Sequence, residues 1–423
     1  MRRLLGGVCV VACALACGCG SGGGGTNPTP TPTRRNGVTA TGTAQSGGPT
    51  PTRTARGAAT PTPTATPGVQ GSRTPTPPGQ RTHTATPTSA PTQPPSLLYV
   101  REGGNDDNPG TSPDAALKTI DKAATLLKPG TILYVGPGTY LGRVSINGRI
   151  GTAAQPIQVL ADTTGAHTGD RPGAVVIDAN ADVVALVVTK SPFVTVDSFI
   201  VTGAVPQTQP NNISATGVQI RNTSDHVTIR NCVVGTAGQG DGIRVDGSSD
   251  VLIFDNLIFD NDRGLLITGD APGTRVINNT IVTHQRAAIA VTLKSGVAPT
   301  NTSVLNNIIQ GNENNIAISV AQGPPSAADT YSGDFNLVFE PGLADQTTAY
   351  NPASIRGAND INADALLENV GQGDVRLDAG SPAVDAGTDT IGAALTSALL
   401  TRTTSPDNAA DSAPLDLGFH YAR

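Results

Sequence analysis

Short stretches in which apolar and polar residues alternate fill the middle of the chain, and they return at a nearly constant interval. Each repeat holds a small residue, a short alternating strand, a turn and a second short strand, followed by Asn or Asp. The four clearest repeats span 216–234, 241–259, 263–282 and 287–309. Aligning their small residues gives steps of 25, 22 and 24 residues, through Gly217, Gly242, Gly264 and Ala288. A period of this length, built from short strands, predicts a solenoid in which each repeat forms one coil.

Asparagine marks the same place in successive repeats, as in VINNTIV at 276–282 and VLNNIIQ at 304–310. The aligned residues are Asn256, Asn279, Asn307 and Asn336, with Cys232 one repeat earlier. Equivalent residues of a coiled chain stack about 4.8 Å apart. Asparagine tolerates the left-handed conformation of a sharp corner, and its amide can both donate and accept. We therefore expect a structural corner ladder, with the preceding residue, Asn278, facing solvent.

The phase of the first strand in each repeat shows which side chains face outward. Its apolar residues alternate inward, so Gln219 and Arg221 point out, followed one repeat later by Arg244 and Asp246. These four side chains are the candidate substrate contacts. The alternative, which the position on an exposed face favours, is an ordinary ion pair between Arg221 and Asp246 worth at most about 1 kcal/mol.

The N-terminus has the pattern of an export signal, with two arginines before a short apolar stretch and small residues. It is too short for a comfortable transmembrane span. The stretch ALAC resembles a bacterial lipoprotein signal, which implies a signal peptide over 1–19 and lipidation of Cys17, with Cys19 as the alternative acceptor. A plain signal peptide with incidental cysteines is the other interpretation. The lipoprotein resemblance implies a lipid anchor in the membrane and a place in the cell envelope, at the outer membrane or cell surface.

Residues 20–96 are a Thr/Pro/Gly-rich tract without apolar periodicity, so we expect a disordered linker. Residues 1–100 contain eight arginines and no Asp, Glu or Lys, which leaves 19 basic and 33 acidic residues in the rest. The resulting net charge of −14 argues against a nucleic-acid partner. Only Cys232 lies outside the signal region, so no disulfide can form within the folded part.

A short capping helix is expected before the repeats. Ser112 and Pro113 have the character of an N-cap and a first helical position. Apolar residues then follow at helical spacing, and KPG ends the helix. They are Leu117, Ile120, Ala124 and Leu127.

With this N-terminal segment and with GSPAVDAGT and PLDLGFHY near the C-terminus, the chain resembles the right-handed parallel β-helix proteins of pectate-lyase-like architecture. The resemblance covers 97–423, with an N-terminal cap at 97–140 and a closing segment at 370–423. It implies an all-β fold and a carbohydrate-associated function, either glycan binding or polysaccharide processing. The fold also carries non-catalytic adhesins and rods, so catalysis stays open between a lyase, a glycoside hydrolase and no turnover.

Few residues point to a particular chemistry. Lys190 or Lys294, each just after a strand, could be the base of a lyase. The expected partners are a polysaccharide or an envelope glycan, bound by a monomer without a cofactor.

Calcium and histidine chemistry have weak support in the sequence. Asp106, Asp107 and Asn108 could hold calcium, although a turn stabilised by their own side chains is the more ordinary interpretation. His226 is expected to be solvated. Neither His284 nor His420 has a partner nearby in the sequence.

Overall fold

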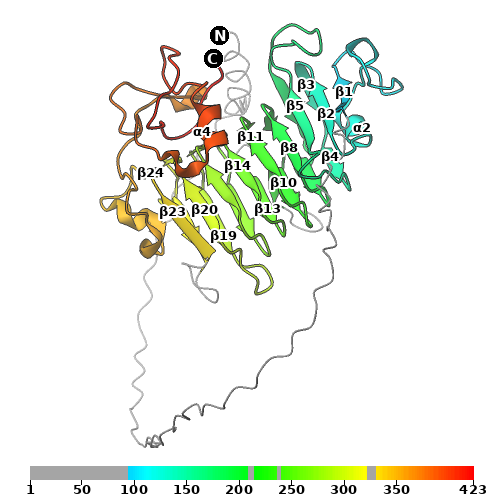
Figure 1. Ribbon diagram of the computed structural model, residues 1–423. Coiled ribbons are helices and arrows are strands. Elements are labelled where there is room, and N and C mark those ends of the chain that lie inside the picture. Colours follow the sequence, from blue (N-terminus) through cyan, green and yellow to red (C-terminus); the bar gives the residue numbers. More distant parts are fainter. Residues whose placement is uncertain (1–93, 208–213, 236–239, 322–329) are drawn as a thin grey trace, which may run out of the picture. The chain divides into compact units, whose positions relative to one another are not determined.

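The computed structural model describes residues 94–207, 214–235, 240–321 and 330–423. The predicted signal peptide, Cys17, Cys19 and almost all of the predicted linker lie outside these residues. Three parallel sheets run along the described part, and each coil of chain adds one strand to each sheet in turn (Figure 1). The predicted solenoid is therefore confirmed.

The three sheets are named here sheet A, sheet B and sheet C. Within the described residues, sheet A is formed by β1 (Ser96–Val100), β2 (Thr131–Val135), β5 (Ile157–Ala161), β8 (Val194–Asp197), β11 (Thr228–Arg230), β14 (Leu252–Phe254), β17 (Arg275–Ile277), β20 (Thr302–Leu305) and β23 (Tyr331–Asp334). Sheet B is formed by β3 (Gly138–Leu141), β6 (Val175–Asp178), β9 (Ile200–Thr202), β12 (Val233–Val234), β15 (Leu257–Phe259), β18 (Thr280–Val282), β21 (Ile308–Gln310) and β24 (Leu337–Phe339). Sheet C is formed by β4 (Val144–Asn147), β7 (Val184–Thr189), β10 (Ala215–Arg221), β13 (Gly240–Asp246), β16 (Arg263–Thr268), β19 (Ile289–Thr292), β22 (Ile318–Val320) and β25 (Tyr350–Asn351).

The register of sheet C confirms the predicted repeat steps. Val218 pairs with Ile243, and the same row continues through Leu265 to Ile289. The side chains of this row are buried, with at most 1% exposure. Val, Ile and Leu from all three sheets fill the interior in the same way, and each fully buried aliphatic side chain contributes about 1.5–3 kcal/mol relative to an exposed one.

A ladder of asparagine side chains runs along the corner between sheets A and B. The backbone N–H of Asn256 donates to Oδ1 of Asn279 at 2.9 Å, and that of Asn279 donates to Oδ1 of Asn307 at 2.9 Å. The N–H of Asn307 continues the row to Asn336 at 3.1 Å. The carboxylate of Asp360 closes it by accepting from the backbone N–H of Asn336 at 2.8 Å. All four asparagines are fully buried, so each side chain satisfies a backbone group that water cannot reach.

The predicted phase of this corner is wrong by one residue. The left-handed conformation belongs to the residue before each ladder asparagine, with φ of 55° at Asp255, 51° at Asn278 and 57° at Asn306. Asn278 does not face solvent either. Its side-chain amide donates to the carbonyl of Asp416 at 3.0 Å and accepts from Asn306 at 3.2 Å. The closing segment covers this corner from outside, which the local repeat pattern could not reveal.

The other two corners carry polar columns of their own. Between sheets C and A, Ser191 donates its N–H to Oγ of Ser224 at 3.1 Å, and Ser224 donates to Oγ of Ser248 at 3.0 Å.

Between sheets B and C, the buried His284 donates its backbone N–H to Oδ1 of Asn312 at 3.2 Å. Its Nδ1 accepts from the N–H of Asn261 at 3.2 Å, and burial lowers the pKa of the ring to about 4. Asn312 in turn donates to Glu340, whose pKa burial raises to about 7. His284, which has no partner nearby in the sequence, is thus a neutral member of a structural column.

The single capping helix predicted from Ser112 onward is wrong. Ser112 caps a short 3-10 helix, η1 (Pro113–Ala115), and Thr119 caps a separate helix, α2 (Ile120–Ala124). Between them, Leu117 donates its N–H to the carbonyl of Tyr99 and accepts from the N–H of Arg101, both at 2.9 Å. Its backbone therefore extends the edge of sheet A, and this pairing interrupts the helix.

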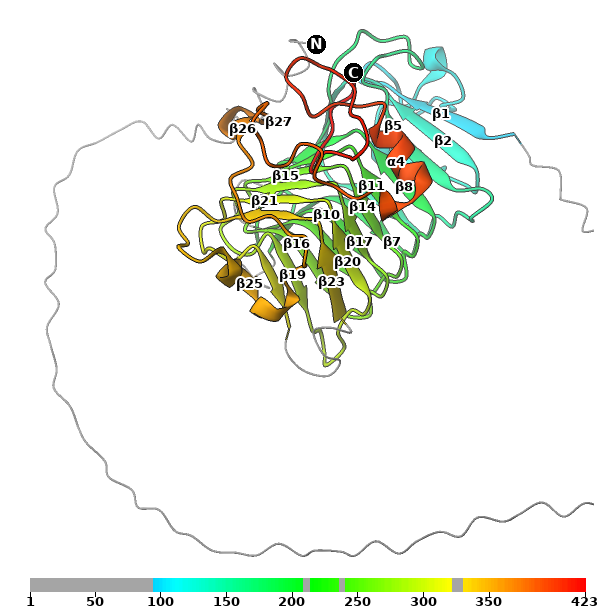
Figure 2. The same cartoon turned by 60° about the vertical axis from the view of Figure 1, so that its left-hand side comes forward.

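The chain ends in a series of short elements outside the coils. They are η2 (Gln346–Ala349), η3 (Ala353–Ile355), β26 (Leu367–Asn369), η4 (Val370–Gln372), β27 (Asp374–Leu377), η5 (Asp389–Ile391) and α4 (Ala393–Leu399). Leu399 and Leu415 pack with Phe254 and Ile277, so α4 lies against sheet A beside its corner with sheet B (Figures 1 and 2). Among the described residues, no helix combines the length and apolar character needed to cross a membrane.

The two asparagines of the NN pair give the first test of this architecture. Asn279→Ala removes the acceptor for two donors of Asn256, and we expect a loss of about 1–3 kcal/mol in the free energy of unfolding. Asn278→Ala should cost a similar amount, because it removes two buried hydrogen bonds and strains a left-handed residue. Asn278→Gly should recover only the part of this free energy that comes from the strained left-handed conformation, because glycine adopts that conformation readily. Chemical denaturation measures all three, and an Asn278→Ala variant within about 0.5 kcal/mol of the parent would contradict the buried position.

Candidate functional site

The candidate site is a groove of about 290 Å³ on the outer face of sheet C. Four neighbouring strands, β4, β7, β10 and β13, form its floor. Its polar and charged lining residues include Arg143, Ser145, Asn147, Gln219, Arg221 and Arg244. A second hollow is lined by Arg143 and Val183 as well, so the two share a wall at the N-terminal part of the sheet.

The alternation of the strands determines which side chains reach this groove. Gln219 lies between Val187 and Arg244 in the sheet register, and Arg221 lies between Thr189 and Asp246. Their apolar neighbours along each strand point into the core. The predicted outward phase and the predicted step from β10 to β13 are therefore confirmed.

Three of the four predicted contacts line the groove together. They are Gln219, Arg221 and Arg244, whereas Asp246 does not line it. Arg143, which directly precedes β4, was not predicted. The sequence does contain a signal for this strand, since apolar and polar residues alternate over 144–147. Its coil, however, lies outside the four clear repeats.

The groove carries positive charge. Among the described residues that line it, three are arginines and none is acidic. Arg143 lies 3.6 Å from the carboxylate of Asp182, and Arg244 lies 3.6 Å from Asp246. Arg221 has no ion pair within the part of the chain that the structure describes, and its side chain is exposed. Among the described groove residues, its guanidinium is thus the cation without an ion pair.

The predicted ion pair between Arg221 and Asp246 is not formed. Instead, Nζ of Lys294 lies 2.6 Å from Oδ2 of Asp246. Asp246 faces Thr268 and then Thr292 across the sheet, and Lys294 follows two residues later. The long lysine side chain reaches back across two coils, and Asp246 therefore pairs with Lys294 in place of Arg221.

A buried carboxylate supports Arg244 from the other side. Asp241 is fully buried, its Oδ1 accepts from Nε of Arg263 at 2.7 Å, and Oδ2 lies 3.9 Å from Nη1 of Arg244. Burial raises the pKa of Asp241, while the charges of Arg263 and Arg244 oppose that rise. The guanidinium of Arg244 therefore lies between two carboxylates, which orient it along the groove.

The other candidates from the sequence are placed away from this chemistry. Lys294 is held by Asp246, and Lys190 is exposed with φ of 50° after β7. His226 stacks on Phe193, with ring centroids 4.4 Å apart.

The predicted calcium loop is instead a network of internal hydrogen bonds. The carboxylate of Asp106 accepts from the backbone of Lys118 and Thr119 and from the Thr119 hydroxyl, and these bonds outweigh burial to lower its pKa. The N–H of Asp107 donates to the side chain of Asn105 at 3.0 Å. No group of His, Cys, Asp and Glu side chains within the described residues is arranged to hold a metal ion.

Comparison with protein families matches residues 185–328 to the right handed beta helix region. The fold is a right-handed parallel β-helix. Three similar solved structures all have low identity to this chain. An alginate lyase from Paenibacillus sp. str. FPU-7 has 17% identity and a TM-score of 0.38, over 53% of this chain and 79% of that chain. The pectate lyase Pel9A has 16% identity and a TM-score of 0.43, over 79% and 98%.

The third structure is a GH136 lacto-N-biosidase from Eubacterium ramulus, with 15% identity and a TM-score of 0.37, over 57% of this chain and 55% of that chain. No curated protein gives a significant match to the sequence.

Double-mutant cycles on the β-helix test the charge assignment. We expect a coupling of about 0.2–1 kcal/mol between Asp246 and Lys294, because Lys294 is half exposed and its ion pair is screened by solvent. The coupling should shrink in high salt. The cycle between Asp246 and Arg221 should give no coupling. A larger coupling energy between Asp246 and Arg221 than between Asp246 and Lys294 would contradict this assignment and support the ion pair predicted from the sequence.

Proposed function

We propose that this β-helix is an exported, lipid-anchored surface protein whose groove on sheet C binds an acidic glycan. One observation carries the proposal. Arg221, an exposed guanidinium without an ion pair in the described part of the chain, stands in a groove whose described lining has no acidic side chain.

The lining has the chemistry that such a ligand requires. A guanidinium can bind a carboxylate or sulfate through two parallel hydrogen bonds, which fixes orientation as well as charge. The neighbouring Gln219, Asn147 and Ser145 offer amide and hydroxyl groups for sugar hydroxyls. Arg143 and Arg244 lie at other parts of the same lining, so the groove can bind more than one acidic sugar of a polysaccharide.

The net charge of −14 for residues 101–423 does not oppose this binding. Charges in salt solution act over a Debye length of about 8 Å, so a bound acidic group responds mainly to the side chains that surround it. Those side chains are arginines, while Asp182, Asp241 and Asp246 are already matched by arginine or lysine. The site is locally cationic on an acidic protein.

Binding is better supported than turnover. Of the two lysines considered as bases, Lys294 is ion-paired with Asp246, and neither Lys190 nor Lys294 lines the groove. We therefore assign no catalytic residue. A rigid rod or an adhesin without this glycan is the alternative, and the binding experiment separates the two.

Glycan binding is tested with Arg221→Gln and a matched control. Arg275 is also an exposed strand arginine, but it belongs to β17 of sheet A, a different sheet from the one that forms the groove. We expect uronate oligosaccharides to bind the parent and Arg275→Gln equally and Arg221→Gln at least about tenfold more weakly, because the variant loses a charge-assisted contact. Calorimetric titration measures this at constant salt, with neutral oligosaccharides and single-stranded DNA as comparison ligands. Equal affinity of Arg221→Gln, or DNA bound as tightly as the uronates, would contradict the site.

Anchoring is tested separately at Cys17. Substitution by Ser should release the full chain from membranes into the soluble fraction, because lipid attachment requires the thiol. Mass spectrometry of the mature parent should find a lipidated Cys17 as the first residue. An unmodified N-terminus would contradict the anchoring proposal. A lipidated Cys19 would keep the anchor but place the lipid two residues further along the chain.

A further inference from the structure

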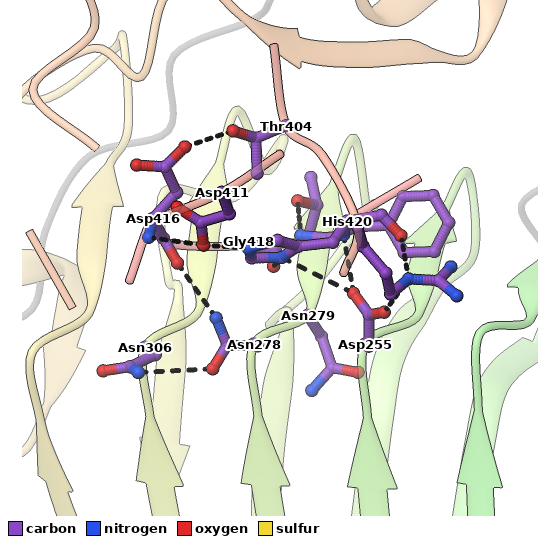
Figure 3. A network of polar contacts seen from close by, with 12 residues as sticks. Asp255, Asn278, Asn279, Asn306, Thr404, Asp411, Asp416, Gly418 and His420 are labelled. Atoms are coloured by element: carbon purple, nitrogen blue, oxygen red, sulfur yellow. Dashed lines mark hydrogen bonds and ion pairs between the residues drawn. The ribbon is translucent and has the colours of Figure 1, made fainter. Parts of the chain in front are cut away.

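The closing segment crosses the corner between sheets A and B one coil at a time. The N–H of Gly418 donates to the carbonyl of Asn306 at 2.9 Å, and that of Phe419 donates to Oγ1 of Thr280 at 3.0 Å. The N–H of His420 then donates to Oδ1 of Asp255 at 2.6 Å (Figure 3). Successive residues of one segment thus bind three successive coils.

His420 is fully buried, and both of its ring nitrogens face oxygen acceptors. Nε2 lies 2.8 Å from Oδ2 of Asp411, and Nδ1 lies 2.9 Å from the carbonyl oxygen of Gly418 and 3.7 Å from Oδ1 of Asp255 (Figure 3). A carbonyl oxygen cannot donate a hydrogen bond. A neutral ring would therefore direct one lone pair at an oxygen, whereas the protonated ring donates on both sides.

The surrounding charges match a protonated His420. Nε of Arg402 lies 2.9 Å from Oδ2 of Asp255 and donates to the carbonyl of His420 at 2.8 Å. Two carboxylates, Asp255 and Asp411, thus face two cations in a site that excludes water. Two further carboxylates lie near the cluster. Asp416 is held by the Thr404 hydroxyl and by the N–H of Asp385, and Asp197 of β8 acts on Asp255 at longer range.

We propose that residues 411–421 of the closing segment form a latch controlled by the proton on His420. The protonated ring holds the segment 411–421 on the corner. Loss of the proton leaves Asp411 facing a lone pair in a buried site, and this segment leaves the corner while the coils stay folded.

The coils can stay folded because they do not depend on this contact. The Asn256–Asn279–Asn307–Asn336 ladder lies inside the corner, and its hydrogen bonds are made between coils. The large apolar core of the coils is separate from the smaller clusters that the closing segment forms on the outer sides of sheets A and B, through Leu399, Leu415, Leu417 and Phe419.

The direction of the pH response follows from the charges. Burial lowers the pKa of His420, but the hydrogen bond to Asp411 and the charges of Asp255 and Asp411 outweigh it, so the pKa stays above its ordinary value. A released segment has an ordinary pKa of about 6.5. The contribution of the proton to holding the latch is therefore full below about pH 6.5 and is lost as the pH rises through the higher pKa of the latched state.

Hydrogen exchange of the full chain tests the latch. After correction for intrinsic exchange rates, peptides covering 411–423 should lose protection as the pH rises above about 6.5, while peptides from β10 and β13 should not. Asp411→Asn should move the midpoint down by at least about one pH unit, because it removes the nearest charge. His226→Gln is the matched control, because His226 is half exposed and lies at another corner, and its midpoint should equal that of the parent.

Histidine-labelled protein gives a second measurement that does not depend on the variant folding. The carbon and nitrogen shifts of one buried histidine should report a protonated ring above pH 6.5. Protection of 411–423 that is independent of pH, or a neutral His420 at pH 6.5, would overturn the proposal. So would loss of protection in the segment and the coils together.

Discussion

The regular coils of this β-helix turn three times, and backbone N–H groups at these turns lie where water cannot reach them. The structure meets this constraint with side chains from the next coil. Asparagine serves one corner, serine the second, and a mixed column that includes His284 and Glu340 the third. Because an unsatisfied buried polar group costs about 1–3 kcal/mol, these columns decide where the chain can turn and therefore the register of all three sheets.

The NN pairs satisfy two requirements with adjacent residues. The second asparagine, such as Asn279, points inward and completes the ladder. The first, Asn278, takes the left-handed conformation and points outward, where the closing segment accepts its amide proton. The same turn thus joins the coils to one another and to the C-terminal segment.

The repeat could be predicted from the sequence because its cause is local. Strand alternation and small residues at fixed steps placed Gln219, Arg221, Arg244 and Asp246 on the outer face. The predictions that were wrong share the opposite cause, because they concern residues whose structure depends on contacts with other segments of the chain. Leu117 was misassigned because a distant strand edge, Tyr99 to Arg101, captures its backbone.

Long-range contacts also determine the partners of Asp246 and His420. The partner of Asp246 is Lys294, two coils further along, and the partners of His420 include Asp255, 165 residues away. Such pairs depend on which segment folds back over which corner, and no local pattern contains that information. Arg143 is an intermediate case, since its strand alternates but its coil departs from the regular spacing.

The groove and the corner show how a solenoid separates stability from recognition. Along sheet C, the inward residues and the backbone pairing carry the fold, so the outward side chains are positioned without supporting the core. Arg221, whose charge has no ion pair among the described residues, can stand there because its strand is held by both neighbours through the backbone. At the corner the same separation is absent, because Asp255 and His420 are buried between coil and closing segment. On the outer face of sheet C, a charged side chain can be substituted without disturbing the fold. At the corner, substitution of a buried charged side chain changes how the closing segment is held.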